Sequence, residues 1–284
     1  MPTPPSRYRA DDPLDYSHRF HAGNVGDVWK HCVLAEVLRR AGTPSTYLES
    51  HAGEGAYPLG PTGEWTEGIG RLRDIAPTDD AVGRYTALCN QLGDDRRYPG
   101  SPLVARAVLG DDTPLLLWER DAGVCERLAG HVPDATITCG DGLAALPDAI
   151  AQTERRDGAV VALIDPPYTQ KADWTTVPDA MIAAVRASRR ACVVLWYPVK
   201  SLTRPNAMIA RLQAAGVSGT IAELVTTPLE HQRRRLNGSG MLLVRPPTGT
   251  LETVAAAAPV LGTHCATFAG VWSLRMQSWT ASDS

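Results

Sequence analysis

The feature that most constrains this chain is a run of six apolar residues, 159–164, that leads directly into Asp165-Pro166-Pro167-Tyr168. The run predicts a buried strand, and two consecutive prolines end its pairing because each lacks an N–H and has a fixed φ. In an open parallel sheet, ligands bind at the carboxyl ends of the strands. The tetrapeptide therefore offers a carboxylate, a carbonyl and an aromatic face to a planar group with an NH2, such as adenine. Taken alone, it could also be an ordinary strand-ending turn, which is the less favoured alternative.

The length of 284 residues suits one large domain, or one domain with an insertion. No stretch approaches the roughly 20 apolar residues that span a bilayer. Residues 1–15 are rich in proline and charge and lack the apolar centre of a signal peptide, so we expect a flexible leader on a cytoplasmic protein. Six scattered cysteines without a Cys-x-x-Cys pair favour reduced thiols over disulfides or zinc, and we expect no metal.

The formal net charge of −3 argues against a protein that coats nucleic acid indiscriminately, because such binding depends mainly on neutralising phosphates. A local basic patch remains open, although short arginine runs are more often a solvated face. The candidate runs are residues 96–97, 189–190 and 233–235.

Three histidines and a lysine gather between residues 18 and 31. The apolar spacing after them predicts a loop over residues 18–24 and a helix over about 27–40, with Gly42 near its end. Lys30 and His31 fall near the helix start, where charge and helix dipole together could hold a ligand carboxylate. A purely structural role for this histidine is the alternative.

A short strand over residues 46–50 is expected to end in the turn His51-Ala52-Gly53-Glu54-Gly55. Its glycines let backbone N–H groups approach a ligand closely, but the third glycine of a dinucleotide fingerprint is missing. A small nucleoside-type ligand is therefore favoured over NAD.

Between residues 57 and 109 the strand signal disappears, and we expect a helical insertion over about 57–102. The insertion returns to the sheet at Tyr98-Pro99-Gly100-Ser101-Pro102. Ser101 either caps the next helix or lines the site.

Two further predicted strands end on acids. Residues 115–119 end on Glu119, which is placed to take both hydroxyls of a ribose. Residues 136–139 lead into Gly140-Asp141-Gly142, where the carboxylate could accept from an adenine amine and the next N–H could donate to the ring. Each acid, taken singly, could instead be a solvated strand end or a helix cap. Continued alternation of strands and helices indicates a doubly wound α/β sheet, with all four strand ends along one edge.

This order of strand ends resembles that of Rossmann-like class I methyltransferases that act on exocyclic amines. More narrowly, the chain resembles the RlmJ family, which makes N6-methyladenine in 23S ribosomal RNA. The resemblance runs from about Tyr16 to beyond Pro247 and is carried by these strings: Tyr-x-His-x-Phe-His-Ala-Gly-Asn, Asp-Val-x-Lys-His, His-Ala-Gly-x-Gly, Tyr-Pro-Gly-Ser-Pro-Leu, Asp-Gly, Ile-Asp-Pro-Pro-Tyr, Leu-Trp-Tyr-Pro-Val and Ser-Gly-Met. Departures are a longer leader, Val25-Gly26 where the family often has His-Ala, and looser similarity beyond His264.

The resemblance implies S-adenosyl-L-methionine as cofactor, 23S ribosomal RNA as partner and one methyltransferase domain over residues 16–284; we also expect a monomer. The residues that it assigns to the cofactor surround the four strand ends: Lys30, His31, His51 and Ser101 at the methionine end, Glu119 at the ribose, Asp141 and Gly142 at the adenine ring, and Asp165.

The same resemblance makes Asp165 catalytic and places Tyr16 against the substrate. We expect Asp165 and the Pro166 carbonyl to accept both N–H groups of the adenine amine, which localises the nitrogen lone pair and aims it at the methyl group. Tyr168 would stack on the base, worth ~1–3 kcal/mol. The target must be unpaired or taken out of a helix.

Several alternatives compete with this hypothesis. DNA adenine methylation uses the same tetrapeptide, and only the longer strings favour RNA. A nucleotide-binding or NAD-dependent Rossmann protein would leave the tetrapeptide without a role, and a non-catalytic RNA-binding module is disfavoured by the acidic net charge. Cytosine-C5 methylation is disfavoured because no cysteine follows a proline. Glutamine methylation is disfavoured because Asp165 stands where those enzymes usually have asparagine.

Overall fold

The computed structural model describes residues 18–43, 45–75, 78–93, 96–154, 158–231 and 236–281. The expected leader, Tyr16 and the arginine run 233–235 lie outside the described residues. Among the described helices, none combines the length and the hydrophobicity needed to cross a lipid bilayer.

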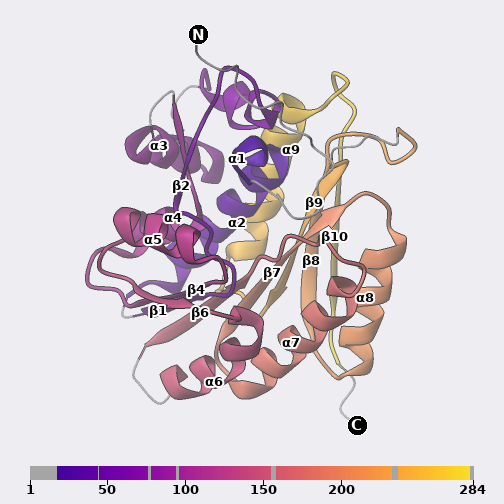
Figure 1. The fold of residues 1–284 in the computed structure, drawn as a ribbon. Helices are drawn as coiled ribbons and strands as arrows, with labels where there is room; N and C mark the ends of the chain where they lie inside the picture. Colours follow the sequence, from indigo (N-terminus) through magenta and orange to yellow (C-terminus); the bar gives the residue numbers. More distant parts are fainter. Residues whose placement is uncertain are drawn as a thin grey trace.

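Strands and helices alternate through most of the described chain (Figure 1). The strands are β1 Ser45–Glu49, β2 Ala56–Pro58, β3 Arg97–Pro99, β4 Leu115–Glu119, β5 Thr136–Cys139, β6 Ala159–Ile164, β7 Cys192–Val199, β8 Gly219–Val225, β9 Gly238–Val244 and β10 Ser273–Trp279. The α-helices are α1 His18–His21, α2 Val25–Ala41, α3 Ala81–Leu92, α4 Ser101–Leu109, α5 Ala122–His131, α6 Gly142–Glu154, α7 Asp173–Ala187, α8 Thr203–Ala214 and α9 Thr250–Cys265. Two 3₁₀ helices are η1 Glu64–Glu67 and η2 Ile69–Leu72.

The main sheet has eight strands in the order β10-β8-β9-β7-β6-β1-β4-β5. From β5 to β7 the neighbours are parallel, which confirms the predicted doubly wound α/β sheet. From β7 to β10 the neighbours are antiparallel. The described residues between β8 and β9 form no helix, and the two strands pair antiparallel; a parallel pair would need a longer crossover.

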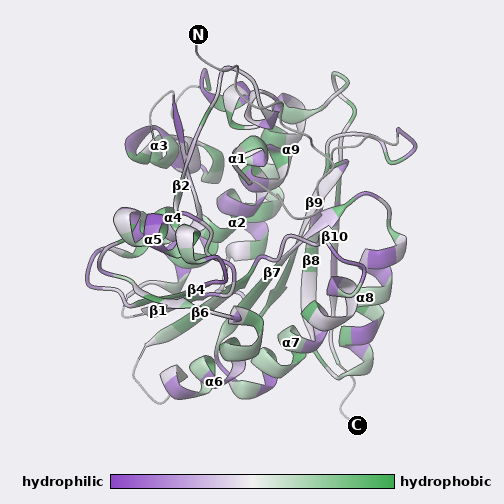
Figure 2. Ribbon diagram, viewed as in Figure 1, coloured by the Kyte–Doolittle hydropathy of each residue, from purple (hydrophilic) through white to green (hydrophobic). Residues whose placement is uncertain are grey.

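Helices cover both faces of this sheet (Figure 1). In β6 the side chains of Val161 and Leu163 belong to one core, and those of the alternating residues belong to the other. α2, α4 and α9 pack on the first face, and α6, α7 and α8 on the second. Figure 2 shows hydrophobic strands between helices whose hydrophilic residues lie outside. Burial on both faces explains why β6 is a continuous apolar run.

α2 is the central helix of the first face and confirms the helix predicted over residues 27–40. It begins after Asn24, whose side-chain oxygen accepts from the Asp27 N–H at 3.0 Å, and it ends at Gly42, whose φ is 68°. Residues 18–21 form the short helix α1 where a loop was expected. Four residues are too few for helical periodicity to show in the sequence. In the structure α1 packs on η1.

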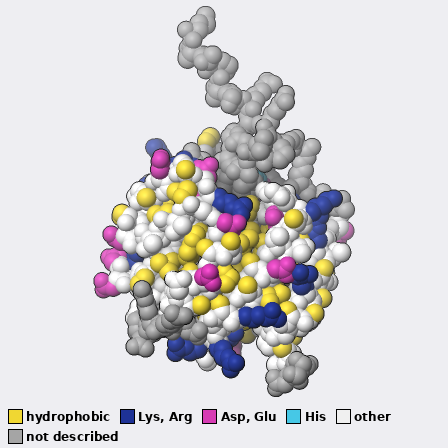
Figure 3. Space-filling model, turned by 60° about the horizontal axis from the view of Figure 1, so that its bottom comes forward, with side chains coloured by type: hydrophobic (Ala, Val, Ile, Leu, Met, Phe, Trp, Pro, Cys, Tyr) yellow, Lys and Arg dark blue, Asp and Glu magenta, His cyan; other side chains and the backbone are white. Residues whose placement is uncertain are grey.

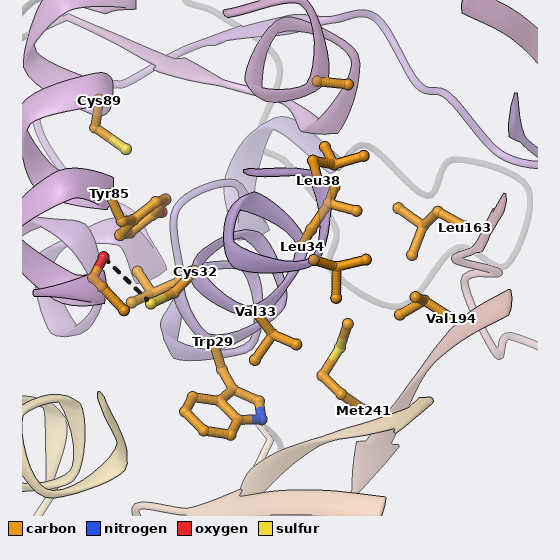
Figure 4. Close-up of a cluster of buried hydrophobic side chains, with 14 of the residues drawn as sticks. Trp29, Cys32, Val33, Leu34, Leu38, Tyr85, Cys89, Leu163, Val194 and Met241 are labelled. Carbon is orange, nitrogen blue, oxygen red and sulfur yellow. Dashed lines mark hydrogen bonds between the residues drawn. The ribbon is translucent and has the colours of Figure 1, made fainter. Parts of the chain in front are cut away.

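The core around α2 fixes this helix against the sheet. Figure 4 shows Trp29, Val33 and Leu34 between Tyr85 of α3 and the strand residue Met241. Trp29 is fully buried, and its Nε1 donates to the Ala222 carbonyl oxygen of β8 at 3.1 Å. Truncating such a residue typically costs about 3–5 kcal/mol. The N-terminal turns of α2 are thereby held in place beside the carboxyl end of β6.

The segment predicted as a helical insertion, about residues 57–102, holds a short two-stranded ribbon besides its helices. The segment contains α3, η1 and η2, but β2 and β3 at its two ends pair as an antiparallel ribbon. Each of these strands has three residues, too few for an alternating pattern to show. The ribbon places Tyr98 beside α2, where its hydroxyl lies 2.7 Å from that of Tyr85.

β10 was not predicted, because its sequence mixes polar and apolar residues. It pairs antiparallel with β8 at the end of the sheet. Arg275 of β10 donates to Oε1 of the fully buried Glu223 at 2.9 Å, and the Tyr197 hydroxyl donates to the same oxygen at 2.8 Å. The buried carboxylate is therefore paired and hydrogen-bonded, as burial of a charge requires.

Candidate active site

Asp165 directly follows β6 and faces the second turn of α2. Its Oδ2 accepts from Lys30 Nζ at 2.6 Å, and the same nitrogen donates to Asp27 Oδ1 at 2.8 Å. Lys30, which we expect to meet a ligand carboxylate, is the sixth residue of α2 and here contacts Asp165. Lys30 and Asp27 are buried, whereas the side chain of Asp165 is 13% exposed. Pro166, which follows, is buried.

The protonation of Lys30 is fixed by these two acids. Burial by itself would lower the pKa of the ammonium group, but the charges and hydrogen bonds of Asp165 and Asp27 raise it to well above its ordinary value. Lys30 therefore stays charged at physiological pH. It fixes one oxygen of Asp165, so that the other oxygen can accept from a ligand.

Tyr168 ends the tetrapeptide in a left-handed backbone conformation, with φ of 49°. This conformation is uncommon for an aromatic residue and costs of order 1–3 kcal/mol. The ring packs against Trp174 of α7, at 4.6 Å between centroids, and against Trp196 of β7, at 6.1 Å. Burial raises the pKa of Tyr168, so the phenol stays neutral. Tyr168, Trp174 and Trp196 together form an aromatic wall. Neither tryptophan was singled out from the sequence, although Trp174 lies only six residues beyond Tyr168.

Glu49 ends β1 and is a fully buried acid that was also missed as a site residue. Ser101 Oγ donates to Oε1 at 2.5 Å, and the Tyr47 hydroxyl donates to Oε2 at 2.9 Å. Burial raises the pKa of Glu49 to about 8, against the lowering effect of the Ser101 hydrogen bond. The available signal was its place at a strand end, the same place that Glu119 occupies in β4.

Ser101 is the first residue of α4, and Gly100 occupies the cap position. The expectation that Ser101 caps this helix is therefore wrong, because its hydroxyl bonds to Glu49. The alternative, that Ser101 lines the site, agrees with this contact.

The two predicted histidines have different surroundings. His51 Nδ1 lies 2.8 Å from Ser50 Oγ; burial lowers the pKa of His51, although the nearby charges of Asp165 and Glu119 act to raise it. His51 therefore lies among the strand-end acids as a neutral ring at pH 7. His31 Nδ1 lies 2.8 Å from the Tyr98 hydroxyl, so this ring is tied to the insertion.

Glycines bring the first and third strand ends into backbone contact. A Cβ on Gly142 would lie 2.1 Å from the carbonyl oxygen of Ser50, so only glycine allows this approach. Gly53 has φ of 62°, and a Cβ there would lie 2.0 Å from the Tyr57 hydroxyl oxygen. The β1 and β5 turns are thus adjacent, as a ligand spanning both would require.

Glu119 ends β4 with its carboxylate turned back to the protein backbone. Oε2 accepts from the N–H of Gly53 at 3.1 Å, while Oε1 accepts from the N–H groups of Arg120 and Asp121 at 2.7 and 3.1 Å. A carboxylate offers about four acceptor positions, so these bonds leave roughly one, on Oε2. The predicted contact with both ribose hydroxyls would require one backbone bond to be given up.

Asp141 follows β5 and caps α6, since its Oδ1 accepts from the Ala144 N–H at 3.2 Å. Its Oδ2 pairs with the guanidinium of Arg120. Burial acts to raise the pKa of Asp141, but the Ala144 N–H and Arg120 lower it below its ordinary value. Asp141 is therefore ionised at neutral pH, and Arg120, which was not predicted as a site residue, covers it.

Several predicted residues, together with Glu49, thus form one row along the carboxyl edge of the parallel strands. Asp165 with Lys30, Glu49 with Ser101, and the Glu119 and Asp141 turns lie along it in strand order. Within the described ranges, no three His, Cys, Asp or Glu side chains are grouped as a metal site would require.

Two of the three arginine runs predicted for a basic patch lie among the described residues. Arginine residues 96–97 and 189–190 are exposed. On the face shown in Figure 3, Lys and Arg side chains occupy several separate places among Asp and Glu. That face therefore has no single block of positive charge among its described residues.

The chain is similar to known proteins over most of its length. Residues 42–280 match the model of the family described as "Ribosomal RNA large subunit methyltransferase D, RlmJ". Ribosomal RNA large subunit methyltransferase J of Escherichia coli is 34% identical over 249 residues, which cover 82% of this chain and 88% of that protein. The protein of the same name from Haemophilus influenzae is 33% identical over 256 residues, covering 84% of this chain and 89% of its own length.

A solved structure shares the fold. The crystal structure of a Legionella pneumophila protein aligns with a TM-score of 0.81 at 25% identity, covering 91% of this chain and 98% of that chain. The family match spans β1 to β10 and therefore includes all four strand ends of the site. The chain belongs to the RlmJ family of large-subunit ribosomal RNA methyltransferases.

Proposed function

We propose that this protein transfers a methyl group from S-adenosyl-L-methionine to the exocyclic N6 amine of an adenine in 23S ribosomal RNA. The observation that carries the proposal is the Asp165 carboxylate, which is held by buried Lys30 at the end of β6 and is still 13% exposed. A fixed acceptor beside a proline carbonyl and an aromatic wall suits a planar amine. Family membership supports ribosomal RNA as the substrate class.

The residues at the other strand ends fit the cofactor. Its methionine end is assigned to Lys30, His31, His51 and Ser101, its ribose to Glu119, and its adenine to Asp141 and Gly142. The adjacency of the β1 and β5 turns at Gly142 and the remaining acceptor position on Glu119 support this placement. When bound, S-adenosyl-L-methionine supplies an electrophilic methyl group on a sulfonium.

Asp165 orients and stabilises the amine. Its free oxygen and the Pro166 carbonyl accept the two N–H groups, which withdraws the nitrogen lone pair from the ring. As the nitrogen is alkylated it gains positive charge, and the carboxylate stabilises that charge in a largely buried corner. The surplus proton then leaves to solvent. Lys30 acts as a positioning residue because it holds the carboxylate in one orientation.

The aromatic wall receives the base. Tyr168 provides a stacking surface, and its packing against Trp174 and Trp196 keeps the strained backbone in place. A target base inside a helix must be turned out to reach this wall, which favours an unpaired or weakly paired adenine. Tyr16 is proposed as a further substrate contact. A single domain over residues 16–284, a monomeric state and a cytoplasmic location complete the proposal.

The proposal is tested by transfer of tritium from labelled S-adenosyl-L-methionine to three substrates side by side: protein-free 23S RNA, assembled large subunits and duplex DNA. We expect label in RNA, recovered after nuclease digestion as N6-methyladenosine, and none with Asp165→Ala. Label in DNA alone would overturn the RNA assignment, and label on another nucleoside would overturn the role given to the amine. Tight binding of S-adenosylhomocysteine without response to NADH separates this function from that of an NAD-dependent protein.

A further inference from the structure

Two thiols meet beside the proposed cofactor edge without any part in the proposed methyl transfer. Cys125 lies in the first turn of α5, and Cys139 is the last residue of β5. Their Sγ atoms are 2.8 Å apart. Cys125 is buried, whereas Cys139 is exposed on the edge strand of the sheet. The pair therefore combines one accessible thiol with one protected thiol in contact with it.

The pair is built into the turns that carry the cofactor acids. Cys125 Sγ lies 3.4 Å from the carbonyl oxygen of Glu119, and Cys139 Sγ lies 3.8 Å from that of Arg120. Cys139 also stands opposite Glu119 in the β4–β5 register and two residues before Asp141. A chemical change at either sulfur therefore takes place beside the turns that carry Glu119 and Asp141.

We propose that Cys125 and Cys139 form a peroxide-responsive modification site, in which Cys139 is oxidised first and Cys125 captures it as a reversible disulfide. The oxidation of the two thiols does not depend on the proposed function, whereas its effect on cofactor binding rests on that function. The oxidant is hydrogen peroxide or another hydroperoxide.

The reaction proceeds in two balanced steps. The Cys139 thiolate attacks one peroxide oxygen: an S–O bond forms, the O–O bond breaks, and hydroxide leaves as water with the thiol proton. The Cys125 sulfur then attacks the sulfenic sulfur: the S–S bond forms, the S–O bond breaks, and the oxygen leaves as a second water with the Cys125 proton. Two thiols lose two electrons, and one hydrogen peroxide is reduced to two waters.

Geometry and access assign the two roles. A disulfide has an S–S length of about 2.0 Å, so the sulfurs need to approach by about 0.8 Å. Cys139 is the exposed thiol that a hydroperoxide reaches. Burial raises the pKa of Cys125 to about 12, so this thiol is a poor first target but stands in contact with the sulfur that it captures.

Capture by Cys125 has a consequence for the site. Without it, Cys139 would proceed to a sulfinate, which is not restored by ordinary thiols. A sulfinate would add negative charge beside Glu119 and Asp141, whereas a disulfide is neutral. The pair is therefore expected to protect the cofactor edge from irreversible damage.

The test uses the full-length protein and three variants: Cys125→Ala, Cys139→Ser and, as a control distant from the pair, Cys192→Ala in β7. Each is treated with a few equivalents of hydrogen peroxide and digested without reduction. Mass spectrometry of wild type and Cys192→Ala should show a peptide linked through Cys125 and Cys139 that dithiothreitol cleaves. Cys125→Ala should instead carry sulfinic or sulfonic acid on its remaining edge thiol.

Binding of S-adenosylhomocysteine is then measured by calorimetry after treatment and again after dithiothreitol. Cys125→Ala should lose about tenfold in affinity without recovery, because of like-charge repulsion, while Cys139→Ser is unaffected. Absence of the linked peptide in wild type, or equal over-oxidation of Cys139 in wild type and Cys125→Ala, would overturn the thiol pair. Failure of every reduced form to bind S-adenosylhomocysteine would instead overturn the proposed function. The two failures can be told apart, because the mass-spectrometric result does not depend on cofactor binding.

Discussion

The corner at Asp165 and the sheet edge at Asp141 are built alike: in each, an acid at the end of a parallel strand pairs with a basic side chain. Their exposure is opposite. The side chains of Lys30 and Asp165 are 4% and 13% exposed, whereas those of Arg120 and Asp141 are 68% and 44% exposed. An exposed ion pair contributes about 0–1 kcal/mol and opens easily, while breaking a buried pair costs several. The buried pair at Asp165 is therefore rigid, whereas the exposed pair at Asp141 opens easily.

The largest effect is expected from Asp165→Asn. The variant keeps the shape of the side chain but loses the charge that stabilises the alkylated nitrogen, so single-turnover methyl transfer should fall by about 10³-fold. The rate is measured with labelled cofactor at saturating RNA. Asp179→Asn, which removes an exposed acid paired with Arg211, is the matched control and should react at the wild-type rate. A similar loss in both variants would contradict the assignment.

Lys30→Met should be the next most severe change. It leaves Asp27 and Asp165 facing each other without their cation, and it should lower the free energy of unfolding by about 3–5 kcal/mol. The acid limb of the pH–rate profile should also move to higher pH, because the two carboxylates then favour sharing a proton. Urea denaturation and rates between pH 5 and 9 check both effects. The exposed Lys200→Met serves as control, and an unchanged pH profile in Lys30→Met would exclude the positioning role.

Glu49→Gln tests the buried acid at the end of β1. Because its pKa is raised from 4.5 to about 8 in the folded chain, Glu49 stabilises the fold fully below about pH 4.5, and this contribution is lost as pH rises toward 8. The free energy of unfolding of wild type should therefore decline between pH 5 and 8 by a few kcal/mol at most. The glutamine variant should show a flatter profile. Parallel profiles for the two proteins would mean that another group titrates.

Tyr168→Ala should weaken RNA binding by about tenfold, the lower part of the range for one base-stacking aromatic. Tyr168→Phe is the conservative control, because the hydroxyl only approaches Met208 Sδ at 4.0 Å and the ring is retained. The dissociation constant for a target RNA fragment, measured with S-adenosylhomocysteine present, checks the difference. Equal binding by both variants would remove stacking from the role of this residue.

Arg120→Leu should give the smallest effect. The free energy of unfolding should change by no more than ~1 kcal/mol, because the pair with Asp141 is exposed. Because Asp141 no longer has a competing cation, the variant should bind S-adenosylhomocysteine up to about threefold more tightly than wild type. Calorimetry measures this affinity. A loss of affinity for S-adenosylhomocysteine beyond about tenfold would show that Arg120 itself contacts the cofactor. It would also show that the ion pair of Arg120 with Asp141 does not simply compete with the ligand.

The sequence alone predicted the parallel half of the fold, because β4 and β6 are apolar runs that lead to an acid, and β1 and β5 lead into glycine turns. It also placed Lys30, Ser101, Glu119 and Asp165 near one edge of the sheet, and the structure has them there. β10 and the β2–β3 ribbon were missed because three-residue strands and a strand of mixed polarity leave no periodic signal.

Tertiary contacts explain the remaining differences at the site. The pairing of Lys30 with Asp165 joins residues 135 positions apart, and that of Ser101 with Glu49 joins residues 52 apart. A local sequence pattern cannot predict contacts between residues so far apart in the chain. Arg120 and Cys139 were likewise not singled out, since their meaning depends on the neighbouring strand.

The contrast between corner and edge is tested most directly by measuring two quantities on Asp165→Asn and Asp141→Asn: the single-turnover rate at saturating cofactor and the Kd for S-adenosylhomocysteine. We expect Asp165→Asn to lose about 10³-fold in rate with a Kd within about tenfold of wild type. We expect Asp141→Asn to weaken Kd by about tenfold and to react near the wild-type rate once saturated. A saturated Asp141→Asn as slow as Asp165→Asn, or a full rate in Asp165→Asn, would contradict the division between them.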